Sequence, residues 1–232
     1  MTEIFHTMMN FLNKGGLFMW PLLFCSIVTV ATIVLAALTL RERRVLPLVI
    51  ESEIERLIPG GSAERLMRIV NEDDSSLAGV VRTALQHLRW PRSENIESVQ
   101  TRARRELVRL ERGLIVLEVV TGIAPLIGLI GTVSGLVHVF SGLGLSTGAS
   151  DTKAVALGIS EALNCTIFGL SIAVPALIGF SYFSKKIEVM SVEMESLVSD
   201  LIAKCYYGRI QSGDPTSPAR SMGPAPARAP VG

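Results

Sequence analysis

The sequence predicts an all-α membrane protein in which three transmembrane helices are extended by long cytoplasmic helices. Hydrophobic residues make up 49% of its 232 residues and charged residues only 19%, whereas a soluble domain usually has about 25% charged residues. The apolar residues gather in three runs long enough to cross a bilayer, which takes about 20 helical residues. Lys and Arg gather on one side of these runs, which indicates a defined topology.

The first predicted span covers residues 17–40 and contains no charged side chain. Trp20, near its start, is typical of an interfacial anchor. A cleaved signal peptide is disfavoured, because the run is long, lacks a basic leading region and ends directly in Arg41-Glu42-Arg43-Arg44. Residues 1–16 are predicted to be periplasmic, and two interpretations stay open for them: a helix lying in the membrane interface, or a frayed terminus.

Residues 41–118 are polar and rich in arginine, and they predict a cytoplasmic helical domain. Pro47, Pro59-Gly60-Gly61 and Pro91 divide it into short helices. From Ile96 to Leu114 the apolar spacing is helical, so we expect one continuous helix running into the second span. The arginines are more typical of a solvated face on the positive-inside side than of nucleic-acid binding, so no nucleic-acid partner is expected.

The second predicted span covers residues 119–141, and residues 142–159 are predicted to form a periplasmic loop. At about 100° per residue this helix divides into two faces. The bulky face holds Leu126, Leu129, Ile130, Val133, Leu136, Val137 and Phe140. The opposite face holds Thr121, Pro125, Gly128, Thr132 and Gly135, flanked by Gly131, Ser134 and His138. Small residues allow helices to approach closely, and hydroxyl groups can line a polar path.

The third predicted span covers residues 160–184 and ends at Lys185-Lys186. Glu161 is the only formally charged residue between Ala154 and Ser184. A carboxyl group inside hydrocarbon costs about 2.5 kcal/mol or more, so Glu161 is a functional-site candidate.

Other polar residues of the third span form a second feature. Ser160, Asn164 and Ser171 share one stripe, about 100° round the helix from Glu161. Pro175 frees backbone groups and is expected to kink the helix. A cytoplasmic helix is predicted for residues 185–210, and the Pro-rich residues 211–232 predict a disordered tail.

The distribution of basic residues gives the orientation. Of the 22 Lys and Arg residues, 14 lie between Arg41 and Arg112, six lie from Lys185 onward, and two lie elsewhere. Three spans with a periplasmic N-terminus and a cytoplasmic C-terminus explain this asymmetry, and the opposite orientation does not.

The sequence gives no sign of an enzyme. Cys25, Cys165 and Cys205 lack metal-ligand spacing, and no nucleotide-binding loop, zinc signature or Ser-His-Asp pattern is evident. We therefore expect no catalytic residue, no metal site and no cofactor.

Two motifs resemble a known family. Ala124-Pro125-Leu126-Ile127-Gly128-Leu129-Ile130-Gly131-Thr132-Val133 resembles the second-helix motif of the MotA/TolQ/ExbB proton-channel family. Gly158-Ile159-Ser160-Glu161-Ala162-Leu163, followed by Thr166, Gly169-Leu170 and Ala173-Val174-Pro175, resembles its third-helix motif. The resemblance covers about residues 17–205 and is nearest to the ExbB and TolQ branch, which has three spans.

The resemblance implies a homopentamer in a bacterial inner membrane, with the second and third helices around a central pore. It implies an ExbD-like or TolR-like single-span partner inside the pore, bearing an essential aspartate, and protons as the coupling ion. The motor would energise a TonB-like or TolA-like protein for outer-membrane transport or envelope maintenance. By motif position, Thr132, Glu161 and Thr166 match the family's pore-lining polar residues. Ser181 departs from the family, because many relatives have asparagine there.

The residues leave some alternatives open. Glu161 and Thr166 lie about 140° apart on an ideal helix, so either one faces a neighbouring subunit or the helix is distorted. A hydroxyl bonded back to its own helix is the structural alternative for Thr166. A non-conducting membrane scaffold and a motility-type stator of the same family are the alternative functions.

Overall fold

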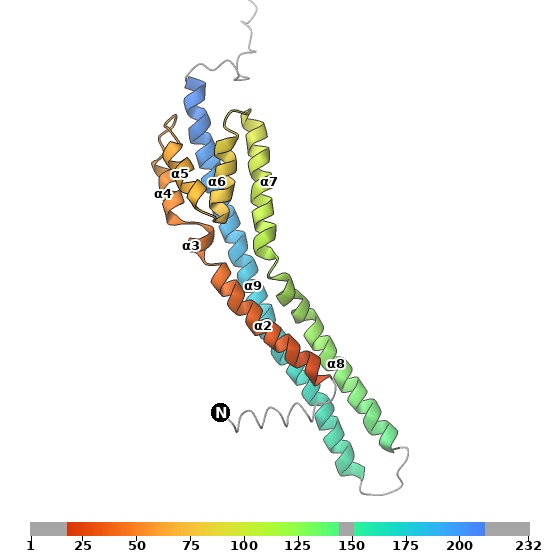
Figure 1. Cartoon of the computed structure of the whole chain (residues 1–232). Helices are drawn as coiled ribbons and strands as arrows, with labels where there is room; N and C mark the ends of the chain where they lie inside the picture. The colour runs from red at the N-terminus through yellow and green to blue at the C-terminus, as the bar shows by residue number, and fades with distance from the viewer. Residues whose placement is uncertain (1–17, 144–150, 212–232) are drawn as a thin grey trace, which may run out of the picture. The chain divides into compact units, whose positions relative to one another are not determined.

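A computed structural model describes residues 18–143 and 151–211 of the chain, and this part is entirely helical, without a strand (Figure 1). The predicted N-terminal interfacial helix and disordered tail, and the central part of the predicted loop, lie outside the described residues. The described part divides into two compact units. The spanning unit holds the residues up to Arg41 and Arg109–Glu188, and the short-helix unit holds Glu42–Val108 and the residues from Val189 on.

The spanning unit contains α2 (Met19–Thr39), α8 (Ile115–Leu143) and the first part of α9 (Asp151–Gln211). Three stretches of these helices are long and apolar enough to cross a membrane, with mean hydropathies of 2.5, 2.0 and 1.9. They contain the three predicted spans almost completely, which confirms three candidate membrane-spanning helices. The bulky face predicted for the second span is directed outward, with Leu126, Val133 and Phe140 more than half exposed, as a lipid-facing surface requires.

Two predicted boundaries differ from the structure. Helix α9 begins at Asp151, so residues 151–159, which we expected in the outer loop, are helical. These residues contain no proline, and an acid at the first position favours a helix N-terminus. The same helix runs through Pro175 and continues past Lys186 to Gln211, so the predicted cytoplasmic helix is the end of α9.

The continuous helix expected from residue 96 into the second span is also wrong. Helix α7 (Arg92–Glu111) ends before α8 begins, and residues 112–114 form a turn in which the Leu114 N–H donates to the Glu111 carbonyl at 2.8 Å. Gly113 lies at the centre of this turn. Glycine disfavours a helix interior by about 1 kcal/mol relative to alanine, which gives a physical reason for a break that apolar spacing alone does not reveal.

The short-helix unit contains α3 (Glu42–Val45), α4 (Leu48–Arg56), α5 (Glu64–Glu72), α6 (Ser76–Gln86), most of α7 and the end of α9. Three of its breaks contain Pro47, Pro59 or Pro91, whereas the break between α5 and α6 contains no proline. Gly60 adopts the positive φ of 79° that its turn requires. Large aliphatic side chains form its core, and those fully buried include Ile50, Ile54, Leu77, Val81, Met194 and Leu201.

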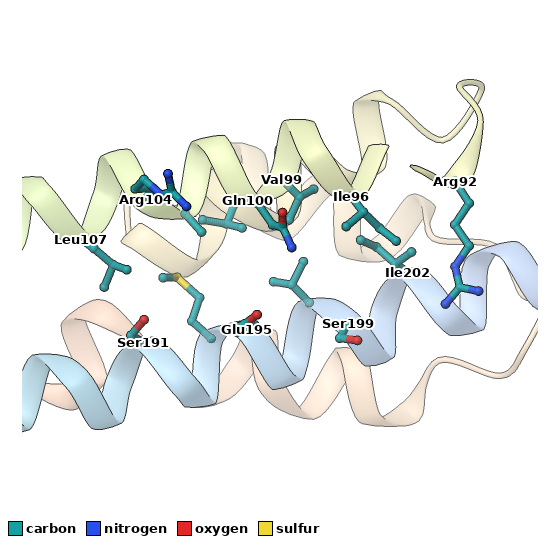
Figure 2. Close-up of a pocket in the computed structure, with 14 residues that line it drawn as sticks. Arg92, Ile96, Val99, Gln100, Arg104, Leu107, Ser191, Glu195, Ser199 and Ile202 are labelled. Atoms are coloured by element: carbon teal, nitrogen blue, oxygen red, sulfur yellow. The ribbon is translucent and has the colours of Figure 1, made fainter. Parts of the chain in front are cut away.

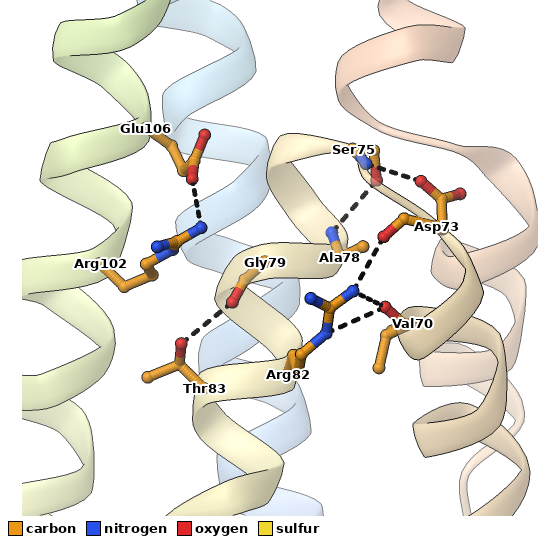
Figure 3. Close-up of polar contacts among 9 residues, drawn as sticks. All are labelled: Val70, Asp73, Ser75, Ala78, Gly79, Arg82, Thr83, Arg102 and Glu106. Carbon is orange, nitrogen blue, oxygen red and sulfur yellow. Dashed lines mark hydrogen bonds and ion pairs between the residues drawn. The ribbon is translucent and has the colours of Figure 1, made fainter.

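Polar side chains fasten the short helices to one another (Figure 3). The Arg82 guanidinium donates to the carbonyl of Val70 in the last turn of α5, at 3.1 Å, and to that of Asp73 just past its end, at 3.0 Å. Ser75 caps α6 by accepting the Ala78 N–H at 3.2 Å. Lys204 of α9 donates to the last carbonyls of α4, at 3.0 Å from that of Ile54. Each bond satisfies backbone groups that helix ends otherwise leave unpaired.

Candidate functional site: a hydroxyl pair between two spanning helices

Helices α8 and α9 approach so closely that their contact is largely backbone against backbone. A Cβ atom added to Gly128 of α8 would lie 2.9 Å from the Cys165 carbonyl oxygen of α9. One added to Gly169 of α9 would lie 2.6 Å from the Ala124 carbonyl oxygen of α8. Real Cβ atoms do not approach other atoms so closely. The glycines are therefore required by the contact, as in other membrane helices packed through small residues.

Two more glycines of α8 extend this contact along the helix. A Cβ atom on Gly131 would lie 2.6 Å from the Cys165 sulfur, and one on Gly135 would lie 2.8 Å from the Ala162 Cβ. Gly128, Gly131 and Gly135, which the sequence offered as pore-lining or helix-packing residues, therefore all face α9. Whether they also line a pore stays a prediction.

The side chains of Thr132 and Thr166 meet inside this close contact. The Thr132 hydroxyl of α8 and the Thr166 hydroxyl of α9 are hydrogen-bonded to each other. Both also lie 3.1 Å from the Gly128 carbonyl oxygen, and Thr132 lies 3.2 Å from that of Ala162. Both residues are half-buried. We call these two hydroxyls and two carbonyls the hydroxyl pair.

The hydroxyl pair has more acceptors than protons. Each threonine supplies one O–H and can also accept, while the carbonyls of Gly128 and Ala162 only accept. The two protons can therefore be arranged in more than one way without moving a heavy atom. Thr166 bonds across to α8, so the alternative of a hydroxyl bonded only to its own helix does not describe it. Such an exchangeable arrangement is what a proton or water path needs.

Glu161 lies in the regular part of α9, five residues before Thr166. Its side chain lies outside the described residues. Because the backbone is helical from one residue to the other, their positions are about 140° apart round α9, and Thr166 faces α8. As the sequence predicted, the backbone therefore places Glu161 and Thr166 on different sides of α9. The role of Glu161 in a pore stays a prediction.

The remaining predicted site residues lie away from the hydroxyl pair. Thr121 donates to the Leu117 carbonyl of its own helix and Ser171 to that of Ile167, both at 2.8 Å. Ser160, Ser171 and Pro175 are exposed, and Pro125 and Asn164 are half-buried. The stripe of Ser160, Asn164 and Ser171 lies on the side of α9 opposite the residues that touch α8, so within this unit the two polar features are separate.

Sequence reasoning missed the partners that α9 contributes. The Ala162 carbonyl, the Cys165 side chain and the close approach of Gly169 were not identified as parts of the site. A signal was present, because Gly158 and Ala162, and again Gly169 and Ala173, are small residues four positions apart, which is the spacing of a tightly packed helix face. Among the described residues, no three His, Cys, Asp or Glu side chains are grouped as metal ligands.

The model of the MotA/TolQ/ExbB proton channel family matches residues 72–196, which include both spanning helices of the hydroxyl pair. The chain belongs to this family. The match covers more than half of the chain and both sequence motifs, so the resemblance inferred from the motifs is confirmed.

Individual relatives agree with the ExbB and TolQ branch. An ExbB-like protein of Synechocystis is 34% identical over 176 residues, which are 72% of this chain and 66% of that protein. The biopolymer transport protein ExbB of Helicobacter pylori is 39% identical over 82 residues, 35% of this chain and 56% of that protein. The ExbB of Neisseria meningitidis is 28% identical over 200 residues, 80% of this chain and 89% of that protein. The chain thus spans less than two thirds of the first two relatives.

Proposed function

We propose that this chain is the proton-conducting subunit of an ExbB/TolQ-type motor in a bacterial inner membrane. The observation that carries the proposal is the hydroxyl pair, because both threonines occupy family motif positions and meet between two spanning helices. The proposal includes five copies around a pore, a periplasmic N-terminus, a cytoplasmic C-terminus and an ExbD-like or TolR-like helix pair inside the pore. The motor would energise a TonB-like or TolA-like protein for transport or envelope maintenance.

The residues support a division of labour between the chain and its partner. Each threonine hydroxyl both donates and accepts a hydrogen bond, so the two hydroxyls can relay a proton between α8 and α9. Glu161 supplies the only formal charge of the third predicted span, and we assign it to the same path. The partner's aspartate loads and releases the proton, and this chain forms the wall past which the proton moves. Protons are the coupling ion, no cofactor takes part, and no bond of a substrate is broken.

A hydroxyl-specific experiment tests this proposal. Thr132→Val and Thr166→Val keep the shape of threonine and remove its hydroxyl, whereas Thr132→Ser keeps the hydroxyl. In proteoliposomes holding the chain with its single-span partner, we expect both valine variants to lose most of the proton flux and the serine variant to retain it. Thr32→Val in α2 is the matched control, because within the described residues the Thr32 hydroxyl bonds to its own helix, at 2.8 Å from the Val28 carbonyl.

The same assay separates the channel from a non-conducting scaffold. Glu161→Gln removes the only formally charged side chain of the third predicted span, and Thr132→Ala removes one of the two hydroxyls of the hydroxyl pair. If the complex stays intact and work driven by the proton motive force survives both changes, conduction along this path is disproved. Native mass spectrometry in mild detergent tests the assembly independently: five copies with two single-span partners support it, and a lone dimer contradicts it.

A further inference from the structure

A groove with a volume of about 530 Å³ lies on the short-helix unit, between α6 and α7. An indole ring, two carboxylates and hydroxyl groups line it, contributed by Trp90, Glu94, Glu97, Thr83 and Thr101. Trp90 belongs to the turn that joins the two helices, and the other four residues lie on the helices themselves. We call this feature the Trp90 groove.

Trp90 is fixed by its main chain, while its side chain stays partly open to solvent. Its N–H donates to the His87 carbonyl at 3.0 Å, and its carbonyl accepts the Tyr206 hydroxyl of α9 at 2.8 Å. The centroids of the Trp90 and His87 rings are 4.0 Å apart. The Trp90 side chain is nevertheless 46% exposed. It therefore offers a flat apolar surface in a fixed position, which is what grooves that bind proline-rich segments provide.

The two carboxylates of the groove have no cation of their own. Glu94 and Glu97 are exposed, and within the described residues neither forms an ion pair. Arg102, which also lines the groove, is paired with Glu106 at 2.7 Å (Figure 3). Arg105 lies about two turns further along α7 than Glu97. The groove therefore fits a ligand in which apolar rings are followed by a cation.

The chain contains a segment of this chemistry directly after α9. Residues 212–232 include five prolines, of which only Pro215 and Pro218 lie three positions apart. A polyproline II helix has three residues per turn, so these two rings fall on the same side of it. Arg220 follows Pro218 by two positions. We call residues 215–220 the proline–arginine motif.

The end of α9 brings this motif within reach of the groove. The hydrogen bond between Tyr206 and Trp90 places α9 beside Trp90 five residues before the helix ends at Gln211. These five residues rise about 7.5 Å along the helix, and the four residues from Gln211 to Pro215 extend about 12 Å in a polyproline II conformation. The chain is therefore long enough to turn back and bring Pro215 to the level of Trp90.

Helices α7 and α9 are antiparallel in this unit. Ile96 and Ile202 lie at one end of the cavity between the two helices, and Leu107 and Ser191 lie at the other end (Figure 2). A segment that turns back after α9 therefore runs in the same direction as α7, and it meets the turn before α7 first.

This direction agrees with the order of residues in the proline–arginine motif. Such a segment passes Trp90 before it reaches the glutamates, whose positions lie about 3 Å and 7.5 Å along α7 from its first residue. In a polyproline II conformation Arg220 lies about 6 Å beyond Pro218. Proline rings placed on Trp90 therefore bring the arginine to the stretch of α7 that carries Glu94 and Glu97.

We propose that the proline–arginine motif docks in the Trp90 groove of the same chain, with its proline rings on Trp90 and the Arg220 guanidinium on Glu94 and Glu97. The groove is thus a binding site for a proline-rich segment that ends in arginine, and the chain carries its own ligand. A short linker holds a tethered ligand at an effective concentration of about 1 mM, which favours the same copy over a neighbouring one. The inference goes beyond the proposed function and does not depend on it, because every residue involved lies outside the candidate spans.

Photo-cross-linking of the full-length chain tests this contact. A benzophenone amino acid replaces Ala219, between Pro218 and Arg220, and two differently tagged copies of the chain are mixed in mild detergent and irradiated. We expect peptide mapping to find the benzophenone joined to residues 83–101 of the same chain, in a product of single-chain size. Pairs that carry both tags through this cross-link should be absent.

Two variants remove opposite sides of the contact. Glu94→Gln with Glu97→Gln keeps the shape of both side chains and removes their charge, so the cross-link yield should fall about threefold, as expected for an exposed ion pair. Pro215→Ala with Pro218→Ala removes both rings and the preformed conformation, so the yield should fall about fivefold or more.

Matched controls exist for both variants. Glu64→Gln with Glu72→Gln removes two exposed carboxylates of α5. Pro224→Ala with Pro226→Ala removes two prolines that follow the motif. Both controls should leave the cross-link yield unchanged, because neither touches the groove or the motif.

The fluorescence of Trp90 gives a second readout that needs no cross-linker. The chain has two tryptophans, so Trp20→Phe leaves Trp90 as the single one. In that background the variant without the two motif prolines should show about twofold more quenching by acrylamide, because the indole ring loses its cover. The variant without Pro224 and Pro226 should match its parent.

Four results would overturn the inference: cross-links to a differently tagged copy, cross-links only outside the groove, yields that neither double variant lowers, or unchanged quenching of Trp90. None of these measurements involves proton flux. The proposed function is tested separately by the threonine and Glu161 variants, so either conclusion can fail while the other stands.

Discussion

The α8–α9 contact of the spanning unit and the core of the short-helix unit hold helices together with opposite kinds of residue. Between α8 and α9 the closest contacts are made at small residues, with Gly128, Gly169 and Ala162 bringing the helices together. In the short-helix unit the contact consists of large aliphatic side chains, and Leu77 and Leu201 are fully buried. The same chain therefore uses its smallest residues at the α8–α9 contact and large ones in the short-helix unit.

The difference follows from the solvent that each unit displaces. In water, burying apolar surface is the main driving force, at about 25 cal/mol per Å², so a large side chain contributes more than a small one. In hydrocarbon that force is absent between helices, and association depends on close packing and on hydrogen bonds such as those of the hydroxyl pair. Four substitutions, in falling order of expected effect on stability, test this contrast.

Leu77→Ala should have the largest effect. Leu77 is fully buried in α6, and truncating such a side chain costs about 2–5 kcal/mol. Hydrogen exchange of the α6 amides in the full-length chain should accelerate accordingly. Leu48→Ala is the control, because Leu48 is 62% exposed and its truncation should leave exchange unchanged within error. Equal effects of the two changes would mean that α6 is not held by an aliphatic core.

Gly169→Ala should be the next most damaging change, although it adds only a methyl group. The new Cβ would lie 2.6 Å from the Ala124 carbonyl oxygen, so α8 must move, at a cost of about 1–3 kcal/mol. Gly122→Ala is the matched control in α8, because a Cβ there meets nothing within 4 Å. Alanine in a helix interior is favoured over glycine by about 0.5–1 kcal/mol, so this control should gain stability. Thermal unfolding in detergent measures both, and the same sign for both variants would contradict the backbone contact.

Ser75→Ala removes the cap of α6 and should cost about 1 kcal/mol. The Ser75 hydroxyl accepts the Ala78 N–H at 3.2 Å, and Asp73 in turn accepts the Ser75 N–H at 2.7 Å. Ser75→Asp keeps a capping oxygen and should behave like the wild-type chain when α6 exchange is measured. If alanine and aspartate are equally destabilising, the effect arises from packing and not from capping.

Thr166→Val should have the smallest effect on stability. A hydrogen bond between membrane helices averages about 0.6 kcal/mol, and valine keeps the shape of threonine. The same change should abolish most of the proton flux. A large loss of thermal stability with normal flux would reverse this prediction and make the hydroxyl pair a packing device.

Much of the fold could be predicted from the sequence. Runs of apolar residues located the three candidate spans, and proline and glycine located most breaks among the short helices. The misplaced boundaries have local causes: Gly113 interrupts a helical apolar spacing, and residues 151–159 are helical although they resemble a polar loop at Asp151 and Lys153. Helix boundaries were predicted from the spacing of apolar residues over many positions. One glycine or two charged residues change that spacing too little to reveal a boundary.

The site could be predicted in part. The division of the second span into two faces indicated which side of α8 would meet a neighbour, and Thr132 and Thr166 were identified by motif position. That their hydroxyls meet depends on the register between α8 and α9, which periodicity within one helix does not contain. The Gly128 and Ala162 carbonyls were missed because every residue has a carbonyl, and only the packing decides which ones accept an extra bond.

The contact through Gly128 and Gly169 has a mechanical consequence. Where side chains separate two helices, a change of rotamer can absorb a small displacement. Here the Cys165 and Ala124 carbonyls stand directly against the facing helix, and main-chain atoms have no rotamers to change. The distance between α8 and α9 is therefore fixed by the covalent geometry of the main chain. A molecule that pushes against this helix pair would have to shift a whole helix to change that distance.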